Sequence, residues 1–108
     1  MGPPDSSPFF EILDEKSLTE NGPQIIEIQG RKIVLVRSGG AVHAVDDTCP
    51  HLGGSLGKGT IQDNCIVCPR HHWSFDFSTG KCVEGVADEK ITVHEVKTES
   101  GKILLKLR

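Results

Sequence analysis

The sequence predicts a single small all-β domain built from antiparallel strands. Short β-branched runs recur along the chain, turn residues separate them, and no window shows an apolar stripe with the 3.6-residue period of a helix. A length of 108 residues suits one domain with a modest core. We expect residues 1–8, which are rich in Pro and Ser, to be disordered and residues 9–108 to form the domain.

Two groups of strands are predicted, one on each side of a glycine-rich segment. The first group is a meander that comprises QIIEIQ (24–29), KIVLVR (32–37) and AVHAVD (41–46). The second group comprises SFDFS (74–78), KCVEG (81–85), ITVHEV (91–96) and KILLKL (102–107). Before the first group, EILDEKSL (11–18) is predicted to form one helical turn.

Charge and composition exclude several classes of protein. A formal net charge of −3 gives the chain no general attraction to nucleic-acid phosphates. No apolar run approaches the roughly 20 residues that span a bilayer, and no secretion signal is recognisable near the start. These features predict a soluble cytoplasmic protein, in which cysteines placed near histidines are more typical of a metal site than of disulfides.

The segment between the strand groups, residues 48–73, carries the candidate chemistry. It holds three of the four cysteines and the glycine-rich run HLGGSLGKGT. A long loop of this kind inside a compact β domain is usually functional. The tripeptide Cys49-Pro50-His51 and the tetrapeptide Cys68-Pro69-Arg70-His71 each offer one thiol and one imidazole.

Two metal arrangements fit these four side chains. A single tetrahedral zinc would accept two sulfurs and two nitrogens, but structural zinc sites usually draw two ligands of one kind from each short arm, and Cys-x-His is too tight for such an arm. Alternatively, each motif delivers its cysteine to one metal and its histidine to a second metal that lies close by. The spacing favours this second arrangement, which suits a [2Fe–2S] cluster, and leaves zinc as the alternative.

Two longer stretches, DDTCPHLGGSLGKG and VCPRHHWSFDFSTGK, resemble the signature of Rieske [2Fe–2S] proteins. The flanking strand runs extend the resemblance over nearly all of residues 9–108. The resemblance implies a Rieske-type antiparallel β-sandwich with two cluster-binding loops at one tip. It also implies one [2Fe–2S] cluster per chain, and the residues implied as ligands are Cys49 and Cys68 for one iron and His51 and His71 for the other.

The resemblance also indicates which residues surround the cluster. His72 stands where the family commonly has a small residue, and we interpret it as a surface histidine and not as a ligand. The glycines of the first loop are expected to bring the backbone close and to aim N–H groups at the cluster sulfurs, and these are Gly53, Gly54, Gly57 and Gly59. The expected rim, on which a redox partner docks, comprises Leu52, Leu56, Lys58, Arg70, His72 and Trp73.

Departures from the respiratory members of the family predict a low reduction potential. Those proteins carry a disulfide between the two loops, whereas Gly54 and Arg70 occupy the corresponding positions here. They also use a Ser and a Tyr to hydrogen-bond the cluster and its cysteine, whereas Trp73 and Phe75 stand near those positions and the chain has no tyrosine. Fewer hydrogen bonds to sulfur lower the potential, which we expect at roughly −150 to 0 mV.

The resemblance implies a soluble low-potential Rieske-type ferredoxin, a one-electron carrier between a reductase and an oxygenase or other terminal acceptor. Because the sequence shows no nucleophile or general-base pair, we interpret the protein as an electron carrier and not an enzyme. The expected partners are a flavin reductase and an oxygenase, which a monomer meets in small, weak encounters. Two alternatives remain open: a structural or electron-transfer small subunit of a nitrite-reductase-like enzyme, and a Rieske domain excised from a larger oxygenase or flavoprotein.

Other cysteines, histidines and acidic residues are interpreted as structural. Cys65 and Cys68 form a C-x-x-C motif, but the motif ends a β-like run and does not open a helix, as dithiol redox motifs normally do. We therefore expect Cys65 to be a small buried apolar residue. The residues expected to have structural roles alone are Cys65, Cys82, His43, His94 and the solvated strand end Asp46-Asp47.

Overall fold

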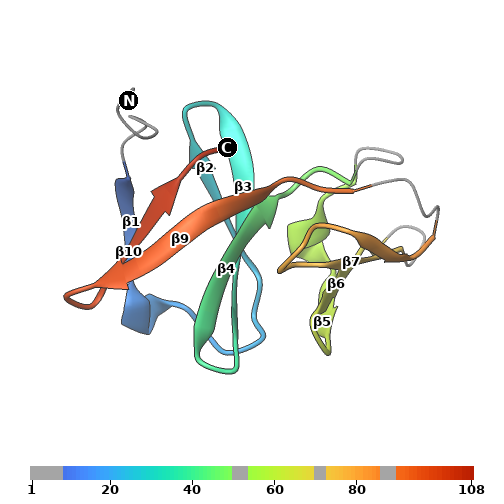
Figure 1. Cartoon of the computed structure of the whole chain (residues 1–108), viewed down its shortest axis with the longest axis horizontal. Helices are drawn as coiled ribbons and strands as arrows, with labels where there is room; N and C mark the ends of the chain where they lie inside the picture. The colour runs from blue at the N-terminus through green and yellow to red at the C-terminus, as the bar shows by residue number, and fades with distance from the viewer. Residues whose placement is uncertain (1–8, 50–53, 70–72, 86–89) are drawn as a thin grey trace, which may run out of the picture.

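The computed structural model describes residues 9–49, 54–69, 73–85 and 90–108, which form two antiparallel β-sheets. The large sheet has the strand order β1-β10-β9-β4-β3-β2, and the small sheet has the order β5-β6-β7-β8. The strands of the large sheet are β1 (Phe10–Asp14), β2 (Gln24–Ile28), β3 (Arg31–Ser38), β4 (Ala41–Asp46), β9 (Val93–Glu99) and β10 (Lys102–Lys106). The strands of the small sheet are β5 (Thr60–Gln62), β6 (Cys65–Val67), β7 (Ser74–Asp76) and β8 (Cys82–Glu84). Figure 1 shows the small sheet at one end of the molecule, beside the large sheet.

The helical content of the described residues is confined to short 3-10 turns. These are η1 (Glu15–Ser17) and η2 (Leu56–Lys58), and η2 lies between β4 and the small sheet. No helix in this part of the chain has the length and apolarity needed to cross a membrane.

The predicted all-β class is confirmed, with two local differences. The one helical turn predicted within residues 11–18 is present as the 3-10 turn at Glu15–Ser17, but Phe10–Asp14 is a strand that pairs with β10 and is not predicted. Pairing with β10 brings Ile12 and Leu13 against the core of the large sheet. Strands β5 and β6 lie within the segment expected to be a glycine-rich loop. They are not predicted because three-residue strands are too short to show an alternating pattern.

Strand β3 is buried on both faces and joins two hydrophobic cores. The first core, on one side of the large sheet, contains Leu18, Ile33, Leu35, Ala44, Ile103 and Leu105. The second core, shared by both sheets, contains Val34, Val36, Val45, Cys49, Leu56, Ile66, Cys68, Phe75, Phe77 and Ile91. Because side chains alternate along a strand, Ile33 and Leu35 enter one core and Val34 and Val36 enter the other. This double burial explains the uninterrupted apolar run in β3.

The small sheet packs against the large sheet through the second core. Its residues Ile66 and Phe75 pair across β6 and β7 and are fully buried. Beyond β7, the ring of Phe77 lies 4.7 Å from the ring of His43 on β4. Cys49 and Cys68 belong to the same core, so the packing that joins the two sheets also positions these two cysteines.

A buried histidine ties the end of the described chain to the large sheet. The amide of Arg108 donates to His94 Nδ1 at 3.0 Å, so the ring proton resides on Nε2, which donates to Asp46 Oδ1 at 2.7 Å. Arg31 donates to the same Asp46 oxygen at 3.3 Å and to the Arg108 carbonyl at 2.9 Å. The structural role expected for His94 therefore agrees with its environment.

The His94 network predicts that the protein loses stability as the pH falls. Burial lowers the pKa of His94 below its ordinary value of 6.5, although Asp46 opposes the shift. Below about pH 6.5 the unfolded chain therefore binds a proton that the folded chain does not, so the free energy of unfolding decreases with falling pH. The slope from one such group is at most about 1.4 kcal/mol per pH unit, and it ends below the folded pKa.

Urea unfolding between about pH 5 and pH 7.5 measures this slope. Burial also lowers the pKa of His43, against the effect of Asp76, so His43 contributes a loss in the same direction. The informative quantity is therefore the difference between the wild type and His94→Gln, which cannot titrate at this position. Equal slopes for the two proteins would show that His94 does not contribute.

Candidate metal centre

The first candidate cysteine ligand lies at the base of a loop that follows β4. Successive pairs of residues close this loop, and these are Asp47 with Leu56, Thr48 with Ser55 and Cys49 with Gly54. The innermost pair is joined by a hydrogen bond of 2.8 Å from the Cys49 amide to the Gly54 carbonyl. The predicted ligand His51 belongs to residues 50–53, which lie outside the described residues.

The second candidate cysteine occupies the same place in the loop between β6 and β7. The Cys68 amide donates to the Trp73 carbonyl at 2.8 Å, directly inside the last β6–β7 pair, Val67 with Ser74. The two hydrogen bonds span the same separation along the chain, so each cysteine begins a loop of equal length. The predicted ligand His71 and its neighbour His72 belong to residues 70–72, outside the described residues.

The two cysteine side chains suit the thiolate end of a [2Fe–2S] cluster. Cys49 is 1% exposed and Cys68 is 0% exposed, and both contribute to the second core. All four cysteines of the chain lie within the described residues, and none of them forms a disulfide. The same residues contain no group of three or more His, Cys, Asp or Glu side chains arranged for a metal ion, since two of the four predicted ligands fall outside them.

Asp47 is a residue of the site that the sequence does not identify. The expectation of a solvated strand end is wrong for this residue, because Asp47 is only 4% exposed. Its Oδ1 accepts hydrogen bonds of 2.8 Å from the Ser55 hydroxyl and from the Gly57 amide. The local signal is weak: a carboxylate stands just before a loop that contains one serine and four glycines as potential donors.

Two of the four loop glycines, Gly57 and Gly59, have roles that differ from those expected, and Gly53 lies outside the described residues. The Gly57 amide donates to Asp47 and the Gly59 amide donates to the Leu56 carbonyl at 3.0 Å, so neither is aimed at a cluster sulfur. Close approach of the backbone is nevertheless confirmed at Gly59, where a Cβ would lie 1.8 Å from the Val67 carbonyl oxygen. At Gly57 a Cβ would lie 2.3 Å from Ile25 of β2. Gly59 is therefore required by packing, because the obstacle there is backbone.

Three of the six residues expected on the docking rim lie within the described residues. Leu56 is wrongly placed there, because it is fully buried in the second core and offers no surface to a partner. Lys58 is exposed, and Trp73 is half-buried with its ring 6.4 Å from that of Phe75. The rim residues outside the described ranges are Leu52, Arg70 and His72.

A cavity of about 240 Å³ opens beside the second cysteine. Its lining residues are Lys58, Gly59, Thr60, Val67, Cys68 and Pro69. The cavity shows that the surface next to Cys68 is hollowed and carries a lysine at its edge.

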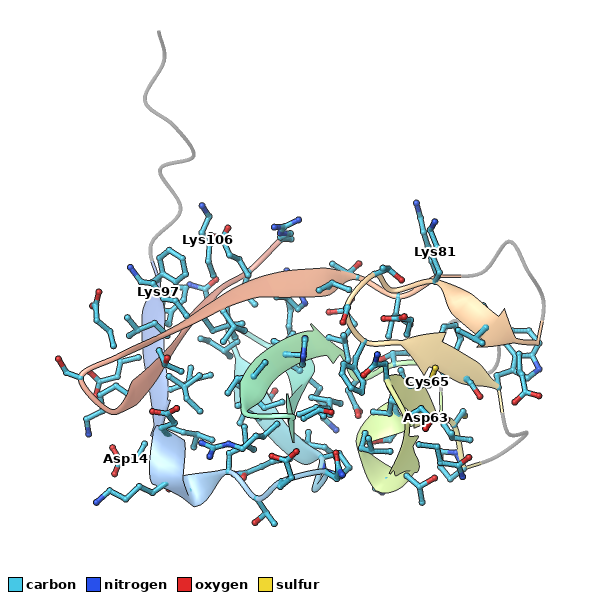
Figure 2. The ribbon with its side chains drawn as sticks, turned by 60° about the horizontal axis from the view of Figure 1, so that its bottom comes forward. Asp14, Asp63, Cys65, Lys81, Lys97 and Lys106 are labelled. Atoms are coloured by element: carbon cyan, nitrogen blue, oxygen red, sulfur yellow. The ribbon has the colours of Figure 1, made fainter. Side chains whose placement is uncertain are left out.

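Cys65 lies on the small sheet among acidic side chains. It is partly exposed, which differs from the expected buried position, and it pairs with Asp76 across β6 and β7. Figure 2 shows Cys65 and Asp63 at the same end of the molecule. Partial burial, together with the charges of Asp76, Asp63 and Glu84, raises the pKa of the Cys65 thiol. A thiol with a raised pKa is a poor nucleophile, so this environment does not favour dithiol chemistry with Cys68.

Comparison with protein families identifies one model, the Rieske [2Fe–2S] domain, which matches residues 9–97. The match includes both cysteines described above and both predicted histidine ligands. A Rieske [2Fe–2S] domain holds a single cluster, in which two histidines replace two cysteines on one iron.

Curated relatives include proteins of very different length. The chain is 39% identical over 84 residues to cholesterol 7-desaturase of Caenorhabditis elegans, which covers 75% of the chain and 20% of the relative. It is 29% identical over 82 residues to the ferredoxin component of the naphthalene 1,2-dioxygenase/salicylate 5-hydroxylase systems of Ralstonia, which covers 76% of the chain and 79% of the relative. The chain therefore spans about a fifth of the length of the desaturases that it matches.

Among solved structures, the ferredoxin of carbazole 1,9a-dioxygenase from Nocardioides aromaticivorans has the same fold. The two superpose with a TM-score of 0.89 at 23% sequence identity, over 94% of this chain and 100% of the ferredoxin. The predicted β-sandwich architecture is thereby confirmed.

Proposed function

Because the chain belongs to the Rieske [2Fe–2S] domain family, whose domains carry electrons, we propose that it transfers single electrons between a reductase and an oxygenase-type acceptor. The observation that supports this proposal is the pair of buried cysteines, each at the base of a loop closed by the same hydrogen bond. The family implies one [2Fe–2S] cluster per chain, and when bound this cluster accepts and releases one electron.

In this proposal, the two loops share the ligands of the cluster. Cys49 and Cys68 bind one iron, and His51 and His71 bind the other, so that each loop contributes one thiolate and one imidazole. The cysteines approach the cluster from the second core, which keeps water away from the thiolates and holds the backbone of both loops in place. The histidines, which follow the cysteines in the loop sequences, supply the edge that meets a partner.

The proposed partners are a flavin reductase, which supplies the electron, and an oxygenase, which receives it. The Ralstonia relative is named as a ferredoxin component of dioxygenase and hydroxylase systems, which supports an oxygenase as acceptor. Small and weak interfaces are typical of redox encounters. Lys58, Trp73 and the cavity beside Cys68 supply surface next to the cluster, together with Leu52, Arg70 and His72 from the intervening segments.

Three further properties belong to this proposal. We propose a monomer, since the exposed large apolar side chains of the described residues, Ile25 and Val83, are scattered and form no extended patch. We propose a cytoplasmic location, because a reducing compartment suits four cysteines of which none is bridged. We propose a potential near the lower end of the Rieske range, roughly −150 to 0 mV, because Trp73 and Phe75 carry no hydroxyl to bond the cluster.

A second candidate is that the chain is the Rieske domain of a longer oxygenase. The specific observation is the match to cholesterol 7-desaturase at 39% identity, which covers only 20% of that protein. In this case the electron passes to a catalytic domain of the same polypeptide and not to a separate acceptor. The sequence of the full reading frame distinguishes the two candidates.

The proposed function is tested first by metal analysis of the purified protein. We expect about two irons per chain and, after reduction with dithionite, the EPR signal characteristic of Rieske clusters. The reduced protein should then be reoxidised by the oxygenase component of a ring-hydroxylating system, and a flavin reductase with NADH should reduce it again. Zinc, or a stable fold without metal, would contradict electron transfer and favour the structural subunit of a nitrite-reductase-like enzyme.

A further inference from the structure

We propose that Asp47 is a positioning residue of the cluster: its carboxylate holds the base of the first cluster-binding loop in the shape that places Cys49. This inference rests on the proposed function, since it concerns the same site. Among the described residues, Asp47 hydrogen-bonds to neither cysteine ligand, and it acts through the residues that close the loop.

The hydrogen bonds of Asp47 join the large sheet to both sides of the loop. On the sheet side, the Asp47 amide donates to the Lys32 carbonyl of β3 at 3.0 Å. On the loop side, Oδ1 accepts from Ser55 Oγ and from the Gly57 amide, each at 2.8 Å, and the Asp47 carbonyl accepts from the Leu56 amide at 2.7 Å. The backbone and the carboxylate of Asp47 thus fix three successive residues, 55–57, in the returning arm of the loop.

Because the Asp47 side chain is buried, losing its hydrogen bonds would be costly. Asp47 is 4% exposed, so its carboxylate has little access to water, and losing its protein donors would leave a buried charge without compensation. Gly57 fits between Asp47 and β2, because a Cβ there would meet Ile25 at 2.3 Å and Asp47 Oδ1 at 3.0 Å. The returning arm of the loop, residues 54–57, is therefore held by the carboxylate of Asp47 and lies against Ile25.

The carboxylate clamp, which is the pair of hydrogen bonds that Asp47 accepts from Ser55 and Gly57, lies next to the proposed cluster site. Ser55 bridges Thr48, and the next pair inward is Cys49 with Gly54. The clamp therefore lies immediately behind the pair that opens the cluster-binding loop. A relaxed clamp would move the Cys49 backbone relative to Cys68, which belongs to the other loop. Because groups that orient metal ligands commonly change metal affinity by ten- to a hundredfold, we expect an effect on cluster retention.

Three variants separate positioning from general stability. In Asp47→Ala, both acceptor contacts are lost, and we expect iron to be released to a chelator about tenfold faster, with an altered EPR line shape. In Asp47→Asn, the amide oxygen can accept the same two hydrogen bonds, so retention and line shape should return close to the wild type. In Ser55→Ala, one contact is lost, and an intermediate rate is expected. Asp46→Asn is the matched control, because Asp46 bonds His94 and Arg31 and not the loop.

A further readout does not need the cluster. Hydrogen exchange of the Gly57 amide, measured in the purified protein before and after removal of metal, should accelerate in Asp47→Ala and stay slow in Asp47→Asn. If the wild type binds no iron, the exchange result still tests the clamp, while the proposed function fails separately. If Asp47→Ala does not fold, the comparison of Ser55→Ala with Asp46→Asn decides the question. The proposal is overturned if Asp47→Ala or Ser55→Ala lowers the melting temperature but keeps wild-type iron retention, EPR line shape and Gly57 exchange.

Discussion

Replacing His71 by alanine should abolish the Rieske EPR signal and reduce the iron content from about two per chain to nearly none. The proposed site uses one thiolate and one imidazole from each loop, and the loss of an imidazole leaves an iron with an incomplete ligand set. His51→Ala should have the same effect for the same reason. EPR after dithionite, together with iron analysis, measures both variants.

His72→Ala is the matched control, because it removes an imidazole from the neighbouring position. The spacing Cys68-Pro69-Arg70-His71 assigns the ligand to the first histidine of the pair, so His72→Ala should keep its iron and its EPR signal. The opposite pattern, with the signal retained in His71→Ala and absent in His72→Ala, would show that the second histidine is the ligand.

Replacing Gly59 by alanine should destabilise the protein by about 3 kcal/mol, near the upper end for overpacking. The new Cβ would lie 1.8 Å from the Val67 carbonyl oxygen and 3.0 Å from its carbon. The obstacle is backbone, and Thr60 pairs with Val67 in the β5–β6 ladder, so neither side can move without breaking that ladder. Urea unfolding gives the change in free energy, and iron analysis shows whether Cys68, the residue after Val67, still binds the cluster.

Gly30→Ala provides a control for the general cost of replacing a loop glycine. Gly30 has a positive φ of 77°, and nothing lies within 4 Å of the position of its Cβ. Its replacement should therefore cost about 1 kcal/mol through backbone strain alone and leave the iron content unchanged. Equal losses for the two variants would contradict the close contact between Gly59 and Val67.

Much of the fold can be predicted from the sequence because the longer strands are β-branched runs bounded by turn residues. The predicted runs 32–37 and 41–46 correspond closely to β3 and β4. The strand β1 is missed, since its pattern within EILD does not alternate and its pairing with β10 depends on residues more than 80 positions away. Strand ends are also imprecise: the run predicted at 91–96 is β9 at Val93–Glu99.

For the site as well, the sequence predicts features that depend on neighbouring residues and misses those that depend on tertiary packing. The ligand assignment is local, because the metal requires thiols and imidazoles at close spacing within each loop, although His51 and His71 remain predictions. Burial is not local: Leu56 and Asp47 both look like exposed loop residues in the sequence, and both are buried by the packing of the loop on β2 and β3. The carboxylate clamp follows from that packing and has no sequence signature of its own.

Because both faces of β3 are buried, the packing of each of the two cores independently fixes the register of this strand. A slip of one residue would exchange Ile33 and Leu35 with Val34 and Val36, since successive side chains point to opposite faces. One core would then receive side chains that are too large and the other side chains that are too small. Neither misfit could be relieved without increasing the other. Alternative alignments of the sheet are thus penalised from both sides, and the correct alignment is the one that brings Cys49 and Cys68 into a common core.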